Sequence, residues 1–145
     1  MKYNILTALI ISIVFLAGSS CSHRIVKTYS NPVVTADAPD PSVIRAGDGK
    51  YYLYATGHGY SIFRSDDLVS WKRIGPVFTD ETWPSAIRNG RRGDLWAPEI
   101  RRIDDKYVLF YTLWFGDVKY SVIGYAVADN PQGPFVDKGV LIDSQ

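Results

Sequence analysis

A four-strand pattern that occurs twice, about 60 residues apart, is the feature of this sequence that most limits its fold. In the first copy, Pro41-Ser-Val-Ile-Arg is followed by Gly49-Lys-Tyr-Tyr-Leu-Tyr. In the second copy, Pro98-Glu-Ile-Arg-Arg is followed by Asp105-Lys-Tyr-Val-Leu-Phe. Repeats of this length, with four short strands each, are typical of the blades of a β-propeller. A β-sandwich also has strands at regular spacing and is the alternative fold.

Short runs rich in Val, Ile and Tyr are the predicted strands, and turn signals such as Asp48-Gly49 and Asp104-Asp105 separate them. No stretch keeps the apolar spacing of an amphipathic helix over three turns, so we predict an all-β domain. The expected strands are residues 42–45, 51–56, 61–64, 71–74, 99–103, 107–112, 121–127 and 140–142.

Two blades cannot close a propeller ring, because each blade packs its face against a neighbour. We therefore expect residues 37–145 to be part of a propeller that is truncated at its C-terminus. This part alone would leave an apolar face and unpaired strand edges exposed. It is expected to aggregate or to unfold without a cooperative transition.

The first 20 residues have the features of a lipoprotein-type export signal. Lys2 supplies a positive end, and Ile5 to Ala17 form an apolar run that is short for a membrane span. Cys21 follows and is the only cysteine, which excludes an internal disulfide. We expect Cys21 to be lipidated and residues 21–36 to form a tether, so that the protein is exported and anchored in a membrane. A secretory signal with an incidental cysteine is the alternative, since Gly18 stands where such lipoprotein signals usually have an aliphatic residue.

The charge distribution of the chain argues against nucleic acid as a partner, and the spacing of its histidines indicates no metal site. The formal net charge is +1, from 16 basic and 15 acidic residues, without a sustained basic patch. His58 lies in a Gly-His-Gly turn and has no further ligands at metal-binding spacing. We therefore name no metal ligand and identify no cofactor. Ten tyrosines and four tryptophans suit either a β-rich core or a surface on which rings stack against a ligand.

The start of the first strand in each repeat is the position expected to face the central axis of a propeller, where ligands commonly bind. Asp40 holds this position in the first repeat. An Asp before Pro can also simply begin a strand, because Asp-Pro favours turns. Glu99 lies two residues beyond the equivalent position in the second repeat and is interpreted as structural. Asp37 is interpreted as a cap of the turn that leads into the domain.

Five motifs follow one another along the chain in a fixed order. They are Ala38-Pro-Asp-Pro-Ser-Val-Ile-Arg, Lys50-Tyr-Tyr-Leu-Tyr-Ala-Thr, Ile62-Phe-Arg-Ser-Asp-Asp-Leu-Val-Ser-Trp, Leu95-Trp-Ala-Pro-Glu-Ile and Asn130-Pro-Gln-Gly-Pro-Phe-Val-Asp-Lys-Gly. Together they resemble the opening blades of glycoside hydrolase family 43. The resemblance implies a five-bladed β-propeller, of which this chain covers about the first two blades. It also implies inverting hydrolysis of plant polysaccharides or oligosaccharides that contain arabinose or xylose.

The resemblance assigns roles to single residues. Asp40 matches the general base, which takes a proton from the attacking water. In the family, the Asp that tunes the acid and the Glu that is the acid start later blades, so this chain is expected to be inactive alone. Trp96 matches a tryptophan of the sugar subsites, and Phe115 matches an aromatic residue beside the scissile sugar in arabinan-cleaving members. Burial between blades is the alternative for both. The resemblance also allows a structural cation on the axis of the full-length protein.

The substrate stays open between two branches of the family. The stretch Gly57-His-Gly-Tyr-Ser-Ile-Phe-Arg-Ser and the pair Phe115-Gly116 resemble the arabinan endo-1,5-α-L-arabinosidase branch, which is the main expectation. Pro39 instead matches exo-acting β-xylosidases and α-L-arabinofuranosidases, since the endo branch usually has His there. A surface glycan-binding propeller without catalysis is the alternative from another class.

Overall fold

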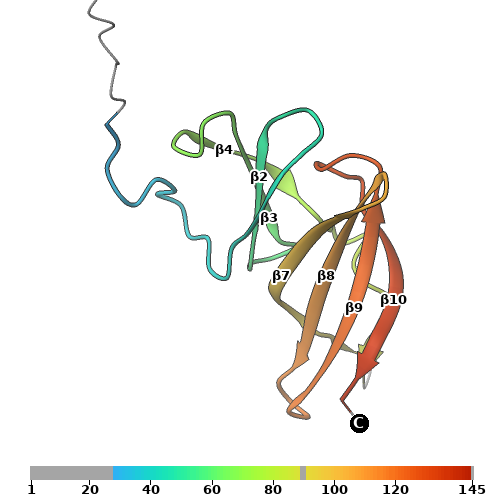
Figure 1. The fold of residues 1–145 in the computed structure, drawn as a ribbon. Helices are drawn as coiled ribbons and strands as arrows, with labels where there is room; N and C mark the ends of the chain where they lie inside the picture. The colour runs from blue at the N-terminus through green and yellow to red at the C-terminus, as the bar shows by residue number, and fades with distance from the viewer. Residues whose placement is uncertain (1–27, 89–90, 145) are drawn as a thin grey trace, which may run out of the picture.

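The computed structural model describes residues 28–88 and 91–144, and in these ranges the chain forms ten β-strands and no helix (Figure 1). The first sheet has the order β1-β2-β3-β4, and the second has the order β10-β9-β8-β7. A two-stranded ribbon connects them. The strands are β1 (Ser42–Arg45), β2 (Tyr51–Ala55), β3 (Ser61–Ser65), β4 (Trp71–Pro76), β5 (Ile87–Arg88), β6 (Arg91–Arg92), β7 (Asp94–Ile103), β8 (Lys106–Phe115), β9 (Tyr120–Ala128) and β10 (Val136–Asp143).

Each sheet is an antiparallel meander whose strands lie in sequence order. Sheets of a Greek-key sandwich contain strands that are not consecutive in the chain, whereas a propeller blade is a consecutive four-stranded unit. The two repeats of the sequence therefore correspond to two blades. Figure 1 shows the second sheet, β7 to β10, beside the sheet that contains β2, β3 and β4.

The predicted strands of both repeats are present, and those of the second blade are longer than expected. The largest difference is β7, which begins at Asp94 instead of Glu99. Pro98 suggested a strand boundary, because proline cannot donate to a sheet ladder. In the structure, β7 is an edge strand, and the pairing with β8 shifts register between Trp96 and Glu99. The strand thus continues past Pro98 through a local irregularity. The ribbon of β5 and β6 was not predicted, because two-residue strands show no periodicity.

The main core lies between the two blades. It includes Tyr54, Tyr60 and Ile62 from the region of the first sheet, and Ile100 and Tyr111 from the second. All five are almost completely buried. The hydroxyls of the buried tyrosines form hydrogen bonds at the edge of this core. For example, the Tyr60 hydroxyl donates a hydrogen bond to the Trp96 carbonyl oxygen over 2.9 Å. The packing of the two blades therefore also fixes the start of β7.

A second, smaller cluster covers the other face of the first sheet. Leu53, Ala55 and Phe63 are buried there, and Val34 and Ala38 of the preceding segment pack against them. In the described part of the chain, no helix is long and apolar enough to cross a membrane. Cys21 and the predicted export signal lie outside the described residues.

Candidate active site

Asp40 stands two residues before β1, where the chain turns into the first strand. Its φ of 50° lies in the left-handed region, which residues other than glycine rarely adopt. The Thr56 hydroxyl, just after β2, donates a hydrogen bond of 2.9 Å to Asp40 Oδ2. The Thr56 main-chain N–H donates to the Pro39 carbonyl oxygen, also over 2.9 Å. The end of β2 therefore holds both the carboxylate and the residue before it.

Ala97 occupies the matching position in the second blade. Its φ is 43°, and it precedes Pro98 as Asp40 precedes Pro41. The Ala97 N–H donates to Thr56 Oγ1 over 2.8 Å. The two matching positions of the repeat thus meet at one threonine side chain. Of these two positions, only the first carries a carboxylate.

A hollow of about 280 Å³ adjoins this contact and is lined by both blades. Its lining residues are Thr56, Gly57, His58, Trp83, Asp94, Leu95 and Trp96. The Trp96 side chain is 48% exposed and stacks on Trp114, with 5.5 Å between the ring centroids. An exposed, supported aromatic face suits packing against the C–H face of a sugar. The placement supports the role predicted for Trp96, and the contact with substrate itself stays a prediction.

Another part of the lining of this hollow comes from His58 and from Trp83, which lies in the loop after β4. The rings of His58 and Trp83 are 5.0 Å apart, and the Arg92 guanidinium carbon lies 5.7 Å from the Trp83 centroid. Arg92 also pairs with Asp80 at 3.1 Å. The sequence shows no pattern around Trp83 that would assign it a role. His58 acts here as an exposed aromatic neighbour of Trp83.

The described residues contain no group of three or more His, Cys, Asp or Glu side chains that could hold a metal ion. Asp40 and Asp94 are the carboxylates at or beside this hollow, and the role of Asp40 as a general base stays a prediction. Burial raises the pKa of the Tyr60 phenol, and the negative charge of Asp40 adds to this effect. Tyr60 thus stays protonated and keeps donating to the Trp96 carbonyl oxygen.

Phe115 is buried, with 2% of its surface exposed, and packs against Tyr120 at 6.1 Å between ring centroids. Phe115 is thus placed as the alternative interpretation, burial between blades, expected. Its contact with a sugar stays a prediction. Phe115 is not among the residues that line the hollow beside Trp96.

Glu99 has the structural role expected for it. Its Oε2 accepts a hydrogen bond of 2.8 Å from the Ser42 hydroxyl, and its carboxylate forms an ion pair with Arg101. The Ile100 N–H donates to the same Ser42 hydroxyl over 3.2 Å. Glu99 therefore links β1 to β7 and is engaged by its neighbours.

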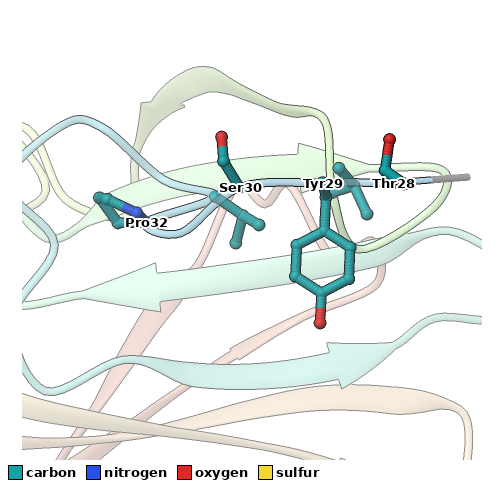
Figure 2. A pocket seen from close by; sticks show the side chains of 6 residues that line it. Thr28, Tyr29, Ser30 and Pro32 are labelled. Carbon is teal, nitrogen blue, oxygen red and sulfur yellow. The ribbon is translucent and has the colours of Figure 1, made fainter.

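Two larger hollows border the N-terminal segment. Figure 2 shows the one of about 560 Å³, which is lined by Thr28, Tyr29, Ser30, Pro32, Val33 and Val69. The other, of about 590 Å³, is lined by Asn31, Pro32, Val33, Val34, Ala36, Ala38, Pro41 and Leu53. None of these lining residues has a carboxylate, imidazole or thiol group. Neither of these two hollows offers a carboxylate, whereas the Asp40 region presents one that is held by a hydrogen bond.

Comparison with protein families and curated proteins identifies relatives of this arrangement. The model of "Glycosyl hydrolases family 43" matches residues 29–145. The probable arabinan endo-1,5-alpha-L-arabinosidase A of Aspergillus flavus is 33% identical over 125 residues, which cover 83% of this chain and 38% of that protein. The non-reducing end alpha-L-arabinofuranosidase BoGH43B of Bacteroides ovatus is 36% identical over 115 residues, 77% of this chain and 22% of that protein. The chain therefore spans less than two-fifths of the length of these relatives.

Solved structures show the same fold. The Cellvibrio cellulosa alpha-L-arabinanase complexed with arabinohexaose aligns with a TM-score of 0.63 at 31% identity, over 76% of this chain and 36% of that chain. The GH43 BlXynB protein from Bacillus licheniformis aligns with a TM-score of 0.66 at 29% identity, over 81% and 25% of the two chains. These structures are five-bladed propellers, and the match covers about their N-terminal part. The prediction of an all-β propeller fold, represented here by about two blades, is confirmed.

Proposed function

The chain belongs to glycosyl hydrolases family 43, and on this premise we propose that it contributes the first blades of a five-bladed glycosidase that cleaves arabinan. One observation carries the proposal. The Asp40 carboxylate is held at the junction of two blades, beside a hollow that presents an exposed tryptophan. Inverting glycoside hydrolysis requires a general base and a general acid, and a fixed carboxylate next to a flat aromatic surface fits the base side of such a site.

In this proposal, Asp40 is the general base of an inverting reaction. Asp40 takes a proton from a water molecule as the water oxygen bonds to the anomeric carbon. The glycosidic C–O bond breaks at the same time, and an acid elsewhere in the propeller protonates the leaving oxygen. Inverting enzymes place these two carboxyl groups roughly 6.5–9.5 Å apart, which leaves room for the water. The two blades described here supply the base, while the acid belongs to the remainder of the fold.

We propose linear 1,5-arabinan and internal cleavage as the main activity. Relatives from Aspergillus flavus and Bacillus subtilis named as endo-acting arabinanases support it. Exo-acting cleavage of arabinofuranosyl units is the second candidate, because Pro39 matches the exo-acting members and the Bacteroides ovatus relative is named for non-reducing end action. The presence of Asp40 in a supported geometry favours catalysis over a purely glycan-binding role.

The experiment incubates the five-bladed protein with linear arabinan and, separately, with xylo-oligosaccharides, and follows the products over time. We expect arabino-oligosaccharides of several lengths early in the reaction. Release of arabinose alone would favour the exo mode, and cleavage of xylo-oligosaccharides alone would favour a xylosidase. A folded protein that binds arabinan and cleaves neither substrate would support the glycan-binding alternative.

We also propose that the protein is exported and anchored through a lipid at Cys21. The apolar run of residues 5–17, followed by small residues and a cysteine, supports this. Mass spectrometry of the mature N-terminus is the test. A lipid-modified Cys21 at the N-terminus is expected, and an unmodified Cys21 or cleavage elsewhere would contradict the proposal.

A further inference from the structure

We propose that Thr56 is a positioning residue that orients Asp40 so that Oδ1 is the oxygen that receives the proton from water. The inference rests on the proposed function, because it requires Asp40 to be the general base. It goes further in assigning a role to a residue outside the carboxylate itself and in distinguishing the two oxygens of Asp40.

The hydrogen-bond chemistry at Thr56 allows one arrangement. A threonine hydroxyl has one proton to donate and lone pairs that accept. The Ala97 N–H can only donate, so Thr56 Oγ1 is the acceptor of that 2.8 Å bond. The ionised Asp40 carboxylate can only accept, so the hydroxyl proton points to Asp40 Oδ2, 2.9 Å away. Rotation of the hydroxyl would break one of the two bonds.

The main chain of Thr56 is fixed as well. Its N–H donates to the Pro39 carbonyl oxygen over 2.9 Å, and Thr56 directly follows β2, which pairs with β1. Thr56 therefore holds Asp40 through its side chain and the preceding residue through its backbone. Ala97 belongs to the second blade, so the orientation of the carboxylate depends on the packing of both blades.

The two oxygens of Asp40 have different surroundings. Oδ2 accepts the Thr56 hydroxyl, whereas Oδ1 accepts no hydrogen bond from the residues that the structure describes. Asp40 is exposed, so water can reach Oδ1. Misplacing a reacting group by about 1 Å can lower a rate on the order of 10²-fold. The loss of the hydroxyl should therefore lower turnover more than substrate binding.

The test uses the five-bladed protein and compares Thr56→Val, which has nearly the same shape without the hydroxyl, with Thr56→Ser, which keeps it. We expect kcat on linear arabinan to fall about 10-fold or more in Thr56→Val, with KM changed less than about two-fold. Thr56→Ser should keep at least about half of the original kcat, since its hydroxyl can make both bonds.

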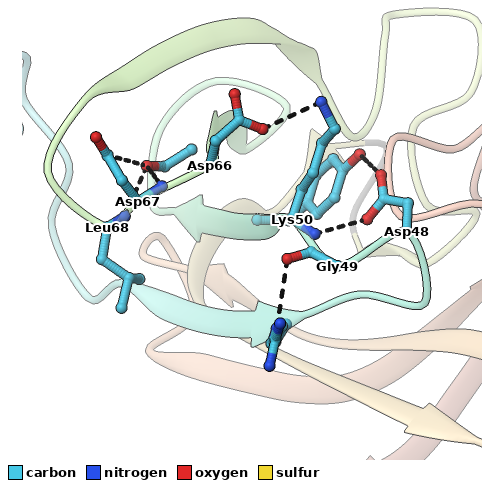
Figure 3. Close-up of polar contacts among 9 residues, drawn as sticks. Asp48, Gly49, Lys50, Asp66, Asp67 and Leu68 are labelled. Atoms are coloured by element: carbon cyan, nitrogen blue, oxygen red, sulfur yellow. Dashed lines mark hydrogen bonds and ion pairs between the residues drawn. The ribbon is translucent and has the colours of Figure 1, made fainter.

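A matched control is available in the turn after β3. The Ser65 hydroxyl also accepts a backbone N–H, from Leu68 over 2.9 Å, and donates to a carboxylate oxygen of Asp67 over 3.1 Å. Figure 3 shows the turn that contains Asp67 and Leu68. Ser65 Oγ also accepts the Asp67 N–H over 3.1 Å, so Ser65→Ala removes three hydrogen bonds of the same two kinds away from the site. It should lower the melting temperature and leave kcat unchanged.

Asp40→Asn separates this inference from the proposed function. If Asp40→Asn keeps near-normal kcat, the base is wrongly assigned and the proposed function fails with it. If Asp40→Asn is inactive and folded Thr56→Val keeps its kcat, only the role of Thr56 is overturned. A ten-fold loss of kcat in folded Thr56→Ser would also overturn it. Should Thr56→Val not fold, Thr56→Ala lacks the hydroxyl as well, and the same criterion on kcat applies.

Discussion

Trp96 leaves about half of its side chain exposed beside Asp40, while Trp114 supports its other face. We predict that Trp96→Ala in the five-bladed protein raises KM for arabinan about three- to ten-fold, since an aromatic contact contributes roughly 0.5–1.5 kcal/mol. Initial-rate measurements would show this. Trp71→Ala is the control, because Trp71 packs against the small cluster of the first sheet and should affect stability but not KM. An unchanged KM in Trp96→Ala would contradict a sugar contact at this residue.

Asp67 closes the turn after β3 by accepting the N–H groups of Val69 and Ser70 over 2.9 and 2.7 Å. These hydrogen bonds, led by that from Ser70, lower the pKa of Asp67 to about 2 from the ordinary 3.8. Because the folded-state pKa is the lower one, the stabilising contribution is present above pH 3.8 and is lost as the pH falls towards 2.

We therefore predict that Asp67→Ala lowers the melting temperature at pH 6, and that the difference from the unmodified protein shrinks between pH 4 and pH 2. Thermal unfolding at a series of pH values is the measurement. Asp66→Ala is the neighbouring control: its ion pair with Lys50, drawn in Figure 3, joins partly and largely exposed side chains and should contribute little. A difference in melting temperature that grows on acidification would show that the Asp67 carboxylate does not stabilise the turn.

At the scale of single residues, the sequence could place Asp40 but not its support. The aligned repeats and the family motifs both point to the position two residues before β1. The contacts that hold it join residues 16 and 41 positions apart in the chain, and neither shows a local pattern. The left-handed backbone of Ala97 is also not predictable from propensity, because alanine rarely adopts it, while aspartate does so occasionally. Contacts between blades therefore decide the geometry of the site.

Among the elements, the pairing of β8 with β9 depends on close contact between Tyr111 and Gly124, which are direct partners in the register. A Cβ atom at Gly124 would lie 2.3 Å from the Tyr111 ring, too close for any side chain. We predict that Gly124→Ala destabilises the folded state by about 1–3 kcal/mol, the usual cost of overpacking. Chemical unfolding of the five-bladed protein is the measurement.

Gly47→Ala is the matched control for this change. Its Cβ would meet the flexible end of Arg102 at 3.4 Å and the Tyr107 hydroxyl at 3.7 Å, which are ordinary van der Waals distances. It should therefore change stability much less than Gly124→Ala. Equal effects of the two substitutions would argue against the Tyr111 contact as the reason for glycine at position 124.

Strand periodicity and turn residues were sufficient to predict the strands of both sheets, because each has one face on a core. Strand periodicity and turn residues failed to predict the start of β7, where tertiary packing overrides the local preference of a proline. Pro98 marks a boundary by its own chemistry, yet it lies inside β7, where an edge position and a register shift accommodate it. The blade packing and the bond from Tyr60 to the Trp96 carbonyl oxygen hold this segment in place.

In the described part of the chain, the sheet of β7 to β10 has one face that is not covered by the main core. One face of β8 and β9 is buried in the main core, and the alternate residues on the other face are apolar and less covered. These residues are Phe110, Ile123, Tyr125 and Val127, whereas Val108 on the same face is itself buried. A propeller blade packs both of its faces, so we propose that this surface receives a further blade.

We predict that residues 28–145 produced alone aggregate or unfold without a cooperative transition, because this apolar face lacks a partner. Size-exclusion chromatography and calorimetry are the measurements, with the five-bladed protein as the control. A soluble monomer with a sharp melting transition would contradict the prediction.

The proposed function requires Asp40 to be the general base of an arabinan-cleaving glycosidase. The decisive measurement is the rate at which the five-bladed protein carrying Asp40→Asn hydrolyses linear arabinan, alongside its melting temperature. We predict a loss of roughly 10²-fold or more in kcat with little change in melting temperature, because the substitution removes the proton acceptor and keeps the shape of the side chain. A rate close to that of the unmodified protein would contradict the account.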